Sequence, residues 1–124
     1  MPIDATQPYD DENIFARILR GEIPCTKVYE DEYTLAFEDI APQAPIHVQV
    51  IPKGQYVSMT DFAENATDAE MAALNRAVIK VVEAKDLKER GYRIISNCGD
   101  EGGQEIPHLH VHVFGGKPLG RMIG

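Results

Sequence analysis

Tryptophan is absent from this chain of 124 residues, cysteine occurs only twice, and long hydrophobic runs are lacking. Cys25 and Cys98 stand in segments without the spacing of metal ligands. A domain of this length buries enough surface to fold without disulfides, so we expect two free thiols. No run approaches the roughly 18 apolar residues that a membrane-spanning helix needs. The acidic start lacks the basic and apolar regions of a secretory signal, so we expect a cytoplasmic protein without a membrane partner.

Positive charge is also in short supply, with 12 Lys and Arg against 20 Asp and Glu and a formal net charge of −8. Nonspecific binding to nucleic acid depends on neutralising phosphates with basic side chains, so this balance disfavours a nucleic-acid partner. A small nucleotide held in a local pocket is compatible with it.

The pattern of apolar residues predicts one α+β domain. Residues 1–10 are polar and aperiodic, so we expect a flexible N-terminal tail followed by a single domain over residues 11–124. Two main helices are expected, over residues 11–21 after an Asp10 or Asp11 cap, and over residues 68–86 after a T-x-x-E capping box. The expected strands cover residues 26–31, 34–40, 46–53, 92–97 and 108–114. Clustered strands favour a five-stranded antiparallel sheet over a doubly wound fold.

Three of the four histidines, His108, His110 and His112, occupy alternate positions of the last expected strand. Leu109, Val111 and Val113 stand between them, so the three imidazoles should leave one face of the strand while the aliphatic side chains enter the core. His47 likewise alternates with valines in an earlier strand. A solvated polar face would not need three histidines in one register, so the cluster indicates a site.

A metal site is one interpretation of this cluster. Alternate positions on a strand are about 6.7 Å apart and the outer pair about 13 Å. Tetrahedral zinc needs donor atoms only roughly 3.4 Å from each other, which weighs against all three histidines serving one ion. Two of them together with His47 still could.

Nucleophilic and acid–base chemistry is the other interpretation. A neutral imidazole, with a usual pKa near 6.5, can attack an electrophilic centre, while a neighbouring ring hydrogen-bonds an anion or protonates a leaving group. Gly102 and Gly103 precede the strand and would let backbone amides approach a phosphate. The central ring, His110, has a neighbouring histidine ring on each side. We expect His108 and His112, the outer rings, each to lack a flanking partner on the outer side.

The segment PHLHVHVF, residues 107–114, resembles the motif of the histidine triad (HIT) family. The resemblance extends over nearly the whole chain after the first dozen residues, through IFARILRGEIP, LAFEDIAPQAPIHVQVIPK, GYRIISN and GGQEIPHLHVHVFGGKPLG. It is strongest to the nucleotide-binding branch that hydrolyses purine nucleoside phosphoramidates. It implies the HIT fold, a homodimer, purine nucleoside monophosphates such as AMP and GMP as ligands, and no metal or other cofactor.

The same resemblance implies roles for individual residues. His110 would be the nucleophile that forms a covalent nucleotidyl intermediate, His112 would contact phosphate and assist the leaving group, and His108 and His47 would orient them. Asp39 matches a ribose-binding position. Positions near the phosphates match Asn97, Gly103 and Gln104. The walls of the base pocket match Phe15, Ile18, Phe37 and Ile40, although core packing is an almost equal interpretation of Ile18 and Phe37.

Two acidic residues depart from the pattern of animal members. Glu105 replaces a serine that can assist the leaving group, and Glu38 replaces a histidine near the ribose. A carboxylate beside phosphate is repulsive unless it faces away or binds a cationic leaving group such as an amine, so both departures bear on which leaving group is preferred. Two functions of other classes stay open beside the hydrolase: a noncatalytic purine-nucleotide-binding module and, less favoured, a metal-binding protein.

Overall fold

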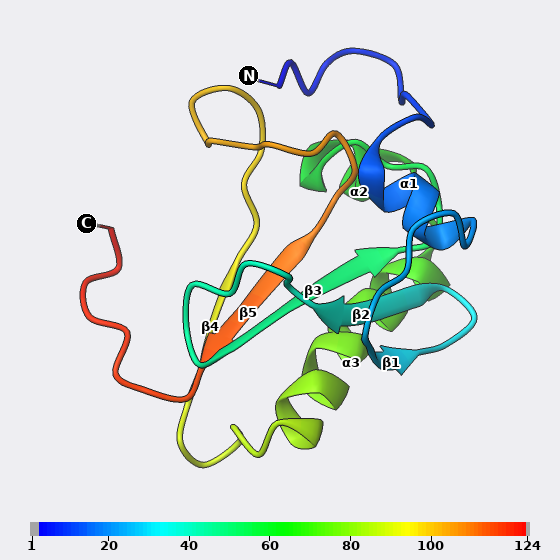
Figure 1. The fold of residues 1–124 in the computed structure, drawn as a ribbon. Helices are drawn as coiled ribbons and strands as arrows, with labels where there is room; N and C mark the ends of the chain where they lie inside the picture. Colours follow the sequence, from blue (N-terminus) through cyan, green and yellow to red (C-terminus); the bar gives the residue numbers. More distant parts are fainter. Residues whose placement is uncertain (1–2, 124) are drawn as a thin grey trace.

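Five antiparallel strands cross the middle of the molecule in the order β1-β2-β3-β5-β4 in this computed structural model, which describes residues 3–123 (Figure 1). The strands are β1 (Lys27–Glu30), β2 (Thr34–Glu38), β3 (Ile46–Pro52), β4 (Arg93–Ile95) and β5 (Val111–Gly115). The predicted α+β class and five-stranded antiparallel sheet are therefore confirmed. Cys25 and Cys98 are free, as expected.

Three helices accompany the sheet: α1 (Ile14–Leu19), α2 (Met59–Asn65) and α3 (Asp68–Ala84). The predicted capping box is present, with Thr67 accepting from the Glu70 amide and Glu70 accepting from the Thr67 amide. The helix ends at Ala84, two residues earlier than predicted, because Asp86 turns the chain with a φ of 59°. The short α2, capped by Ser58, was not predicted. None of the helices in residues 3–123 is long and apolar enough to cross a membrane.

One face of the sheet packs against α3 and is apolar throughout. Alternate residues of the central strands meet one side of the helix, and all are at most 7 % exposed. This core contains Ala36, Val48, Val50, Val111 and Val113 from the strands and Leu74, Ala77, Val78, Val81 and Val82 from α3. The outward side chains of β2, β3 and β5 are consequently free to form the opposite face.

On the opposite face, α1 lies over one end of the sheet (Figure 1). Phe15 of α1 packs there with Leu35, Phe37 and Ile51. We call this group the Phe15 cluster. The rest of the face is left to the histidines.

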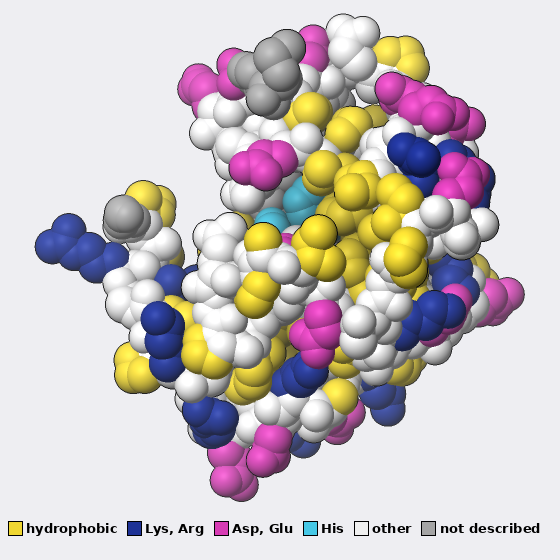
Figure 2. Space-filling model, in the orientation of Figure 1, with side chains coloured by type: hydrophobic (Ala, Val, Ile, Leu, Met, Phe, Trp, Pro, Cys, Tyr) yellow, Lys and Arg dark blue, Asp and Glu magenta, His cyan; other side chains and the backbone are white. Residues whose placement is uncertain are grey.

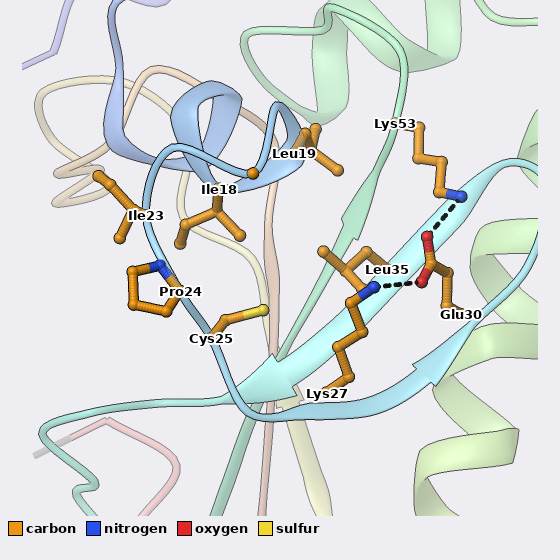
Figure 3. A pocket seen from close by; sticks show the side chains of 10 residues that line it. Ile18, Leu19, Ile23, Pro24, Cys25, Lys27, Glu30, Leu35 and Lys53 are labelled. Atoms are coloured by element: carbon orange, nitrogen blue, oxygen red, sulfur yellow. Dashed lines mark hydrogen bonds and ion pairs between the residues drawn. The ribbon is translucent and has the colours of Figure 1, made fainter.

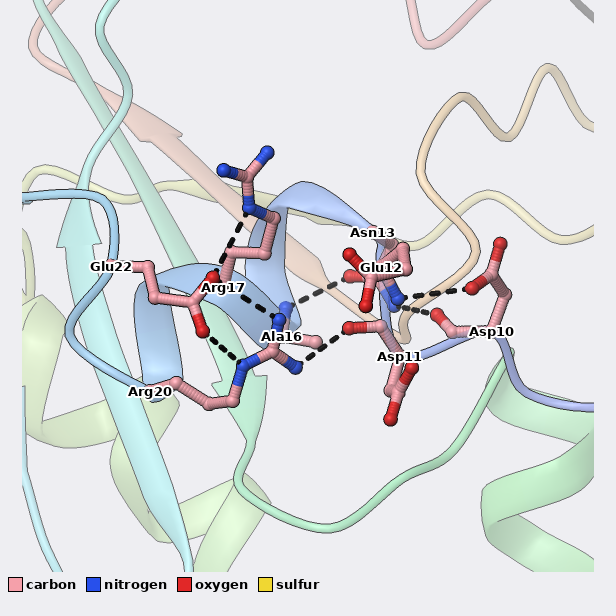
Figure 4. A network of polar contacts seen from close by, with 8 residues as sticks. All are labelled: Asp10, Asp11, Glu12, Asn13, Ala16, Arg17, Arg20 and Glu22. Atoms are coloured by element: carbon pink, nitrogen blue, oxygen red, sulfur yellow. Dashed lines mark hydrogen bonds and ion pairs between the residues drawn. The ribbon is translucent and has the colours of Figure 1, made fainter.

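A polar network fixes the start of α1 and thereby the position of Phe15 (Figure 4). The cap is Asn13, whose Oδ1 accepts from the Ala16 amide at 2.9 Å and whose Nδ2 donates to the Asp10 carbonyl at 2.7 Å. Arg20 reaches back to the Asp11 carbonyl. The prediction of an Asp10 or Asp11 cap was wrong because the helix begins several residues later than the polar pattern indicated.

The last strand begins at Val111, three residues later than predicted. The Leu109 amide donates to the Tyr56 carbonyl instead of to a neighbouring strand. β4 is likewise shorter than the predicted strand over residues 92–97, and Ser96 beyond its end donates through its hydroxyl to the His110 carbonyl. His108 and His110 therefore stand on the irregular segment that enters β5.

Candidate active site

The four histidines lie on the face opposite α3. Histidine atoms are visible at the bottom of a recess that hydrophobic side chains border in part (Figure 2). His112 is on β5 across from Gln49 of β3, and His47 is across from Phe114. Leu109, Val111 and Val113 enter the α3 core between the imidazoles. The predicted division into an aliphatic and a histidine face is confirmed, although only His112 of the three belongs to the strand itself.

His108 is fully buried and held at both ring nitrogens. Its Nε2 lies 2.8 Å from the Pro52 carbonyl oxygen, so this nitrogen carries the proton and donates. Its Nδ1 is then an acceptor, and the Tyr9 hydroxyl donates to it at 2.6 Å. Burial lowers the pKa of His108 to about 4, so the ring is neutral at pH 7. Tyr9 comes from the segment predicted to be a flexible tail; the mobility of residues 1–10 stays a prediction.

His110 is fixed by the backbone of its own triad. Its Nδ1 lies 2.7 Å from the His108 carbonyl oxygen and must donate, which leaves a lone pair on Nε2. The Phe15 ring contacts it edge-on, with centroids 5.0 Å apart. Burial lowers the pKa of His110, while the bond to the carbonyl and the charges of Glu105 and Asp39 act in the opposite direction.

His47 has its tautomer set by a backbone amide. The Gln43 N–H donates to His47 Nδ1 at 3.1 Å, so the proton is on Nε2. That Nε2–H donates to His112 Nδ1 at 2.9 Å and lies 3.4 Å from Asp39 Oδ2. Burial lowers the pKa of His47 against the opposing effect of Asp39.

His112 receives two donors at one nitrogen. Besides His47, the Gln49 side-chain amide donates to Nδ1 at 3.2 Å, so the proton of His112 is on Nε2. The ring stacks on Phe114 with an interplanar angle of 8°. Burial, followed by the neighbouring His110 and His47, lowers the pKa of His112 to about 4.

These contacts leave two ring nitrogens without a partner among residues 3–123: Nε2 of His110 and Nε2 of His112. The first offers a lone pair and the second a proton, on rings whose centroids are 5.0 Å apart. A nucleophile thus stands beside a hydrogen-bond donor. The expectation that the outer rings lack flanking partners was wrong, because Tyr9 flanks His108 and His47 flanks His112.

Asp39 places a carboxylate at the edge of the same cluster. Its Oδ1 accepts from the Ala41 amide and its Oδ2 from the Gln49 side-chain amide, both at 2.8 Å. Burial alone would raise the pKa of Asp39, but these hydrogen bonds together with His47 hold it below its usual value. The carboxylate is therefore ionised at neutral pH. Gln49 was not singled out from the sequence, although the alternation of β3 puts it on the face of His47.

The residues expected to line the base pocket are only partly brought together. The rings of Phe15 and Phe37 are in edge-to-face contact, with their centroids 5.5 Å apart. Ile18 is half-buried against the Phe15 cluster. Ile40 is 94 % exposed, so it can border a ligand only from the open side of the recess.

The loop before β5 is held together by its own hydrogen bonds. The side chain of Gln104 is buried, donates to the Val57 and Ile106 carbonyls and accepts from the Gly99 amide. The backbone amides of Gly103 and Gln104 donate within the loop, to Asp100 and Gly99. The side chain of Gln104 and the two backbone amides therefore stabilise the conformation of the loop in this structure. Of the other expected positions, Asn97 is half-buried and Glu105 is exposed.

Glu38 lies away from the histidines. It forms an ion pair with Lys85, the C-cap residue of α3, on the other side of the sheet. Glu38 therefore does not face the histidine cluster, because adjacent residues of an extended segment point to opposite faces and Asp39 points toward the cluster. A place for Glu38 near the ribose stays a prediction.

A hollow of about 510 Å³ borders the Phe15 cluster through Ile18 and Leu35 (Figure 3). Glu30 bridges Lys27 and Lys53 at its rim, with both distances at 2.8 Å. None of the four histidines lines this hollow. Its apolar walls suit an apolar ligand group, but none of its lining side chains is an imidazole that could act as a nucleophile.

Asp39, His47 and His112 also offer ligand atoms within 4.8 Å of one another, the arrangement that a metal ion would need. To bind a metal ion here, His47 and His112 would each need a lone pair on the ring nitrogen that faces the ion. His47 Nε2 instead carries a proton, because the Gln43 amide occupies Nδ1 as donor. The hydrogen bonds therefore favour a chain of proton donors and acceptors at these atoms.

Comparison with known proteins finds relatives over most of the chain. The model of the HIT domain family matches residues 20–119. An uncharacterised 13.2 kDa HIT-like protein of Azospirillum brasilense is 62 % identical over 93 % of this chain and 94 % of its own. The purine nucleoside phosphoramidase of Escherichia coli K12 is 40 % identical over 91 % and 94 %. A crystal structure described as a HIT family hydrolase from Legionella pneumophila superposes with a TM-score of 0.79 at 38 % identity, covering 90 % of this chain and 98 % of that one.

Proposed function

This chain belongs to the HIT domain family, and on that premise we propose that it hydrolyses purine nucleoside phosphoramidates at the α-phosphorus through a covalent intermediate on His110. The observation that carries this proposal is the free lone pair of His110 Nε2 beside the free N–H of His112. The Escherichia coli relative named a purine nucleoside phosphoramidase supports the substrate class.

In the first step, the lone pair of His110 Nε2 forms a bond to phosphorus. The bond from phosphorus to the leaving nitrogen breaks, its electron pair stays on nitrogen, and the amine takes up a proton. His112 is placed to supply that proton from Nε2, because the negative charge of a bound phosphate favours the cationic form of an adjacent ring and raises its pKa from about 4. The cationic ring also carries a proton on Nδ1, so the N–H groups of His47 and Gln49 then donate to Asp39 Oδ2 instead.

In the second step, water attacks phosphorus and the bond to His110 Nε2 breaks, which releases the nucleoside monophosphate. The proton that water gives up replaces the one taken by the amine. The carbonyl of His108 holds His110 Nδ1–H throughout and thereby keeps the ring oriented. His108 and His47 act as orienting groups in this scheme.

The rest of the nucleotide extends across the same face. Asp39 accepts hydrogen bonds from the ribose hydroxyls, and Phe15, Phe37, Ile18 and Ile40 border the purine. Asn97 and the loop containing Gly103 and Gln104 lie along the phosphates. Glu105, whose charge acts on His110, attracts a cationic amine leaving group.

We also propose a two-fold homodimer formed through α3 and β4. β4 is an edge strand of the sheet, and its Ile94 is 52 % exposed. Ile79 on α3 is 42 % exposed. An apolar edge strand is a ready site for pairing with another chain. Sedimentation at micromolar concentration should give a species of twice 13.8 kDa, and a stable monomer would overturn the dimer.

The decisive experiment compares turnover of an adenosine phosphoramidate with binding of AMP. Turnover is expected; AMP binding without turnover would favour a noncatalytic nucleotide-binding module. Exhaustive chelation should leave turnover unchanged. Loss of activity on chelation, restored by one specific ion, would instead favour the metal-binding interpretation of Asp39, His47 and His112.

A further inference from the structure

Gln49 is a buried polar side chain that joins two functional groups. It is 5 % exposed on β3, directly across from His112. Its Nε2 donates to Asp39 Oδ2 at 2.8 Å and to His112 Nδ1 at 3.2 Å. Its Oε1 is buried and has no hydrogen-bond partner among residues 3–123.

The orientation of this amide is dictated by the two groups that it meets. Asp39 Oδ2 and His112 Nδ1 are both acceptors, the latter because His47 donates to it. Turning the amide over would set its oxygen against two acceptors, so Nε2 must face them. The orphaned oxygen on the other side is a cost to folding that an apolar side chain of similar length would avoid. Stability alone therefore does not account for a glutamine here.

Two independent donors hold the Asp39 carboxylate. The Ala41 amide fixes Oδ1 and Gln49 fixes Oδ2, both at 2.8 Å. Without Gln49, the second oxygen keeps only His47 Nε2, at 3.4 Å, and that proton is already donated to His112. The carboxylate could then rotate about its Cβ–Cγ bond. A rotated carboxylate presents its free lone pairs in other directions.

We propose that Gln49 is a positioning residue that holds Asp39 in the orientation that accepts the ribose hydroxyls, and so makes the site selective for ribonucleotides over deoxyribonucleotides. This inference rests on the proposed role of Asp39 in ribose binding. Gln49 acts through Asp39 and does not touch the nucleotide, because its own oxygen is buried.

The test is the ratio of kcat/KM for an adenosine phosphoramidate to that for its 2′-deoxy analogue. Gln49→Met removes both hydrogen bonds and keeps the length of the side chain. We expect it to lower this ratio about tenfold, the effect of one lost charged hydrogen bond. Gln49→Leu serves as a second variant should Gln49→Met not fold. The matched control is Thr34→Val, a polar-to-apolar change at a fully buried position of β2 whose hydroxyl has no hydrogen-bond partner among residues 3–123, which should leave the ratio unchanged.

A double-mutant cycle with Asp39→Asn separates positioning from packing. If Gln49 acts through Asp39, adding Gln49→Met to Asp39→Asn should not change the ratio further. Unchanged discrimination in Gln49→Met, or the same loss in the presence and absence of Asp39, would overturn the inference. If the wild-type protein binds AMP but does not turn over the phosphoramidate, the proposed reaction fails; Gln49 is then tested by the binding ratio of AMP to 2′-deoxy-AMP, with the same expected change.

Discussion

The two faces of the central sheet differ in kind although the same strands build them. The face against α3 is filled by apolar side chains, nearly all of them aliphatic. The other face carries four imidazoles, a glutamine and an aspartate, several of them as deeply buried as the aliphatic residues. Burial on the first face stabilises the fold directly. On the second, a buried polar group costs free energy unless it is hydrogen-bonded, and the proposed chemistry is assigned to the two ring nitrogens that have no partner among residues 3–123.

The contrast predicts that the largest effect on activity comes from the histidine face. His110→Ala should reduce kcat by more than about 10³-fold, because no other described ring offers a free lone pair at this position. AMP binding should change little, since His112, Asp39 and the Phe15 cluster remain. Steady-state kinetics and calorimetry measure the two effects. Near-normal turnover in His110→Ala would break the assignment of chemistry to this ring.

On the α3 face the expected effect is on stability alone. Leu74 is 3 % exposed in the α3 core, and Leu74→Ala should lower the free energy of unfolding by about 2–5 kcal/mol. Chemical denaturation measures this change. The kcat of the folded fraction at 25 °C should equal that of the wild type. A selective loss of kcat in this variant would show that the two faces are coupled.

Stability should fall with acidification because of the histidine face. The pKa of His108 and that of His112 are about 4 in the folded protein, against 6.5 for an exposed histidine. Between these values the unfolded chain binds protons that the native state does not, so stability is complete above pH 6.5 and is lost as pH falls toward 4. For the fully buried His108 this loss is on the order of 3 kcal/mol.

The same measurement separates the two faces, since all four histidines lie on one of them. Unfolding free energies of the wild type and of His108→Asn, compared from pH 7.5 to 4.5, should show a shallower slope in the variant. Leu74→Ala should keep the wild-type slope. Parallel curves for the wild type and His108→Asn would contradict the neutral buried state of His108.

The smallest expected effect concerns Tyr9. Tyr9→Phe removes the donor to His108 Nδ1 and keeps the edge-on ring contact, whose centroid distance is 5.5 Å. We expect a loss of about 1 kcal/mol in stability and only a few-fold change in kcat. Tyr33→Phe, at another half-buried tyrosine, is the control. If Tyr9→Phe had the same free energy of unfolding as Tyr33→Phe, the hydrogen bond from Tyr9 to His108 would not be maintained in solution.

Period-two patterns made most of the fold and the facing of the histidines predictable. His110 and His112 were identified by alternation with Val111 and Val113, which is local information. Where the pattern failed, specific hydrogen bonds, one distant in sequence and others local, determine where the elements begin. β5 begins late because Leu109 bonds to Tyr56, and α1 begins late because Asn13 binds both the Asp10 carbonyl and the Ala16 amide.

The protonation pattern of the site was out of reach of the sequence. It depends on Pro52 and Tyr9, which are distant from His108 in sequence, and on the turn that brings the Gln43 amide back to His47. The alternation of β3 puts Gln49 on the face of His47, but its contacts depend on the position of Asp39, which follows the end of β2. Glu38 and Asp39 are adjacent, and the hydrogen bonds of Asp39 to Ala41 and Gln49 show that its carboxylate faces the site.

The central claim is that His110 Nε2 forms a bond to the nucleotide, and rapid quenching of the wild-type enzyme during turnover of an adenosine phosphoramidate tests it most directly. Mass spectrometry of the quenched protein should show an acid-labile adenylyl adduct, located on His110 by peptide mapping at neutral or alkaline pH. An adduct on His108 or His112, or turnover with no adduct at any time point in a sample that shows a burst of released amine, would contradict it.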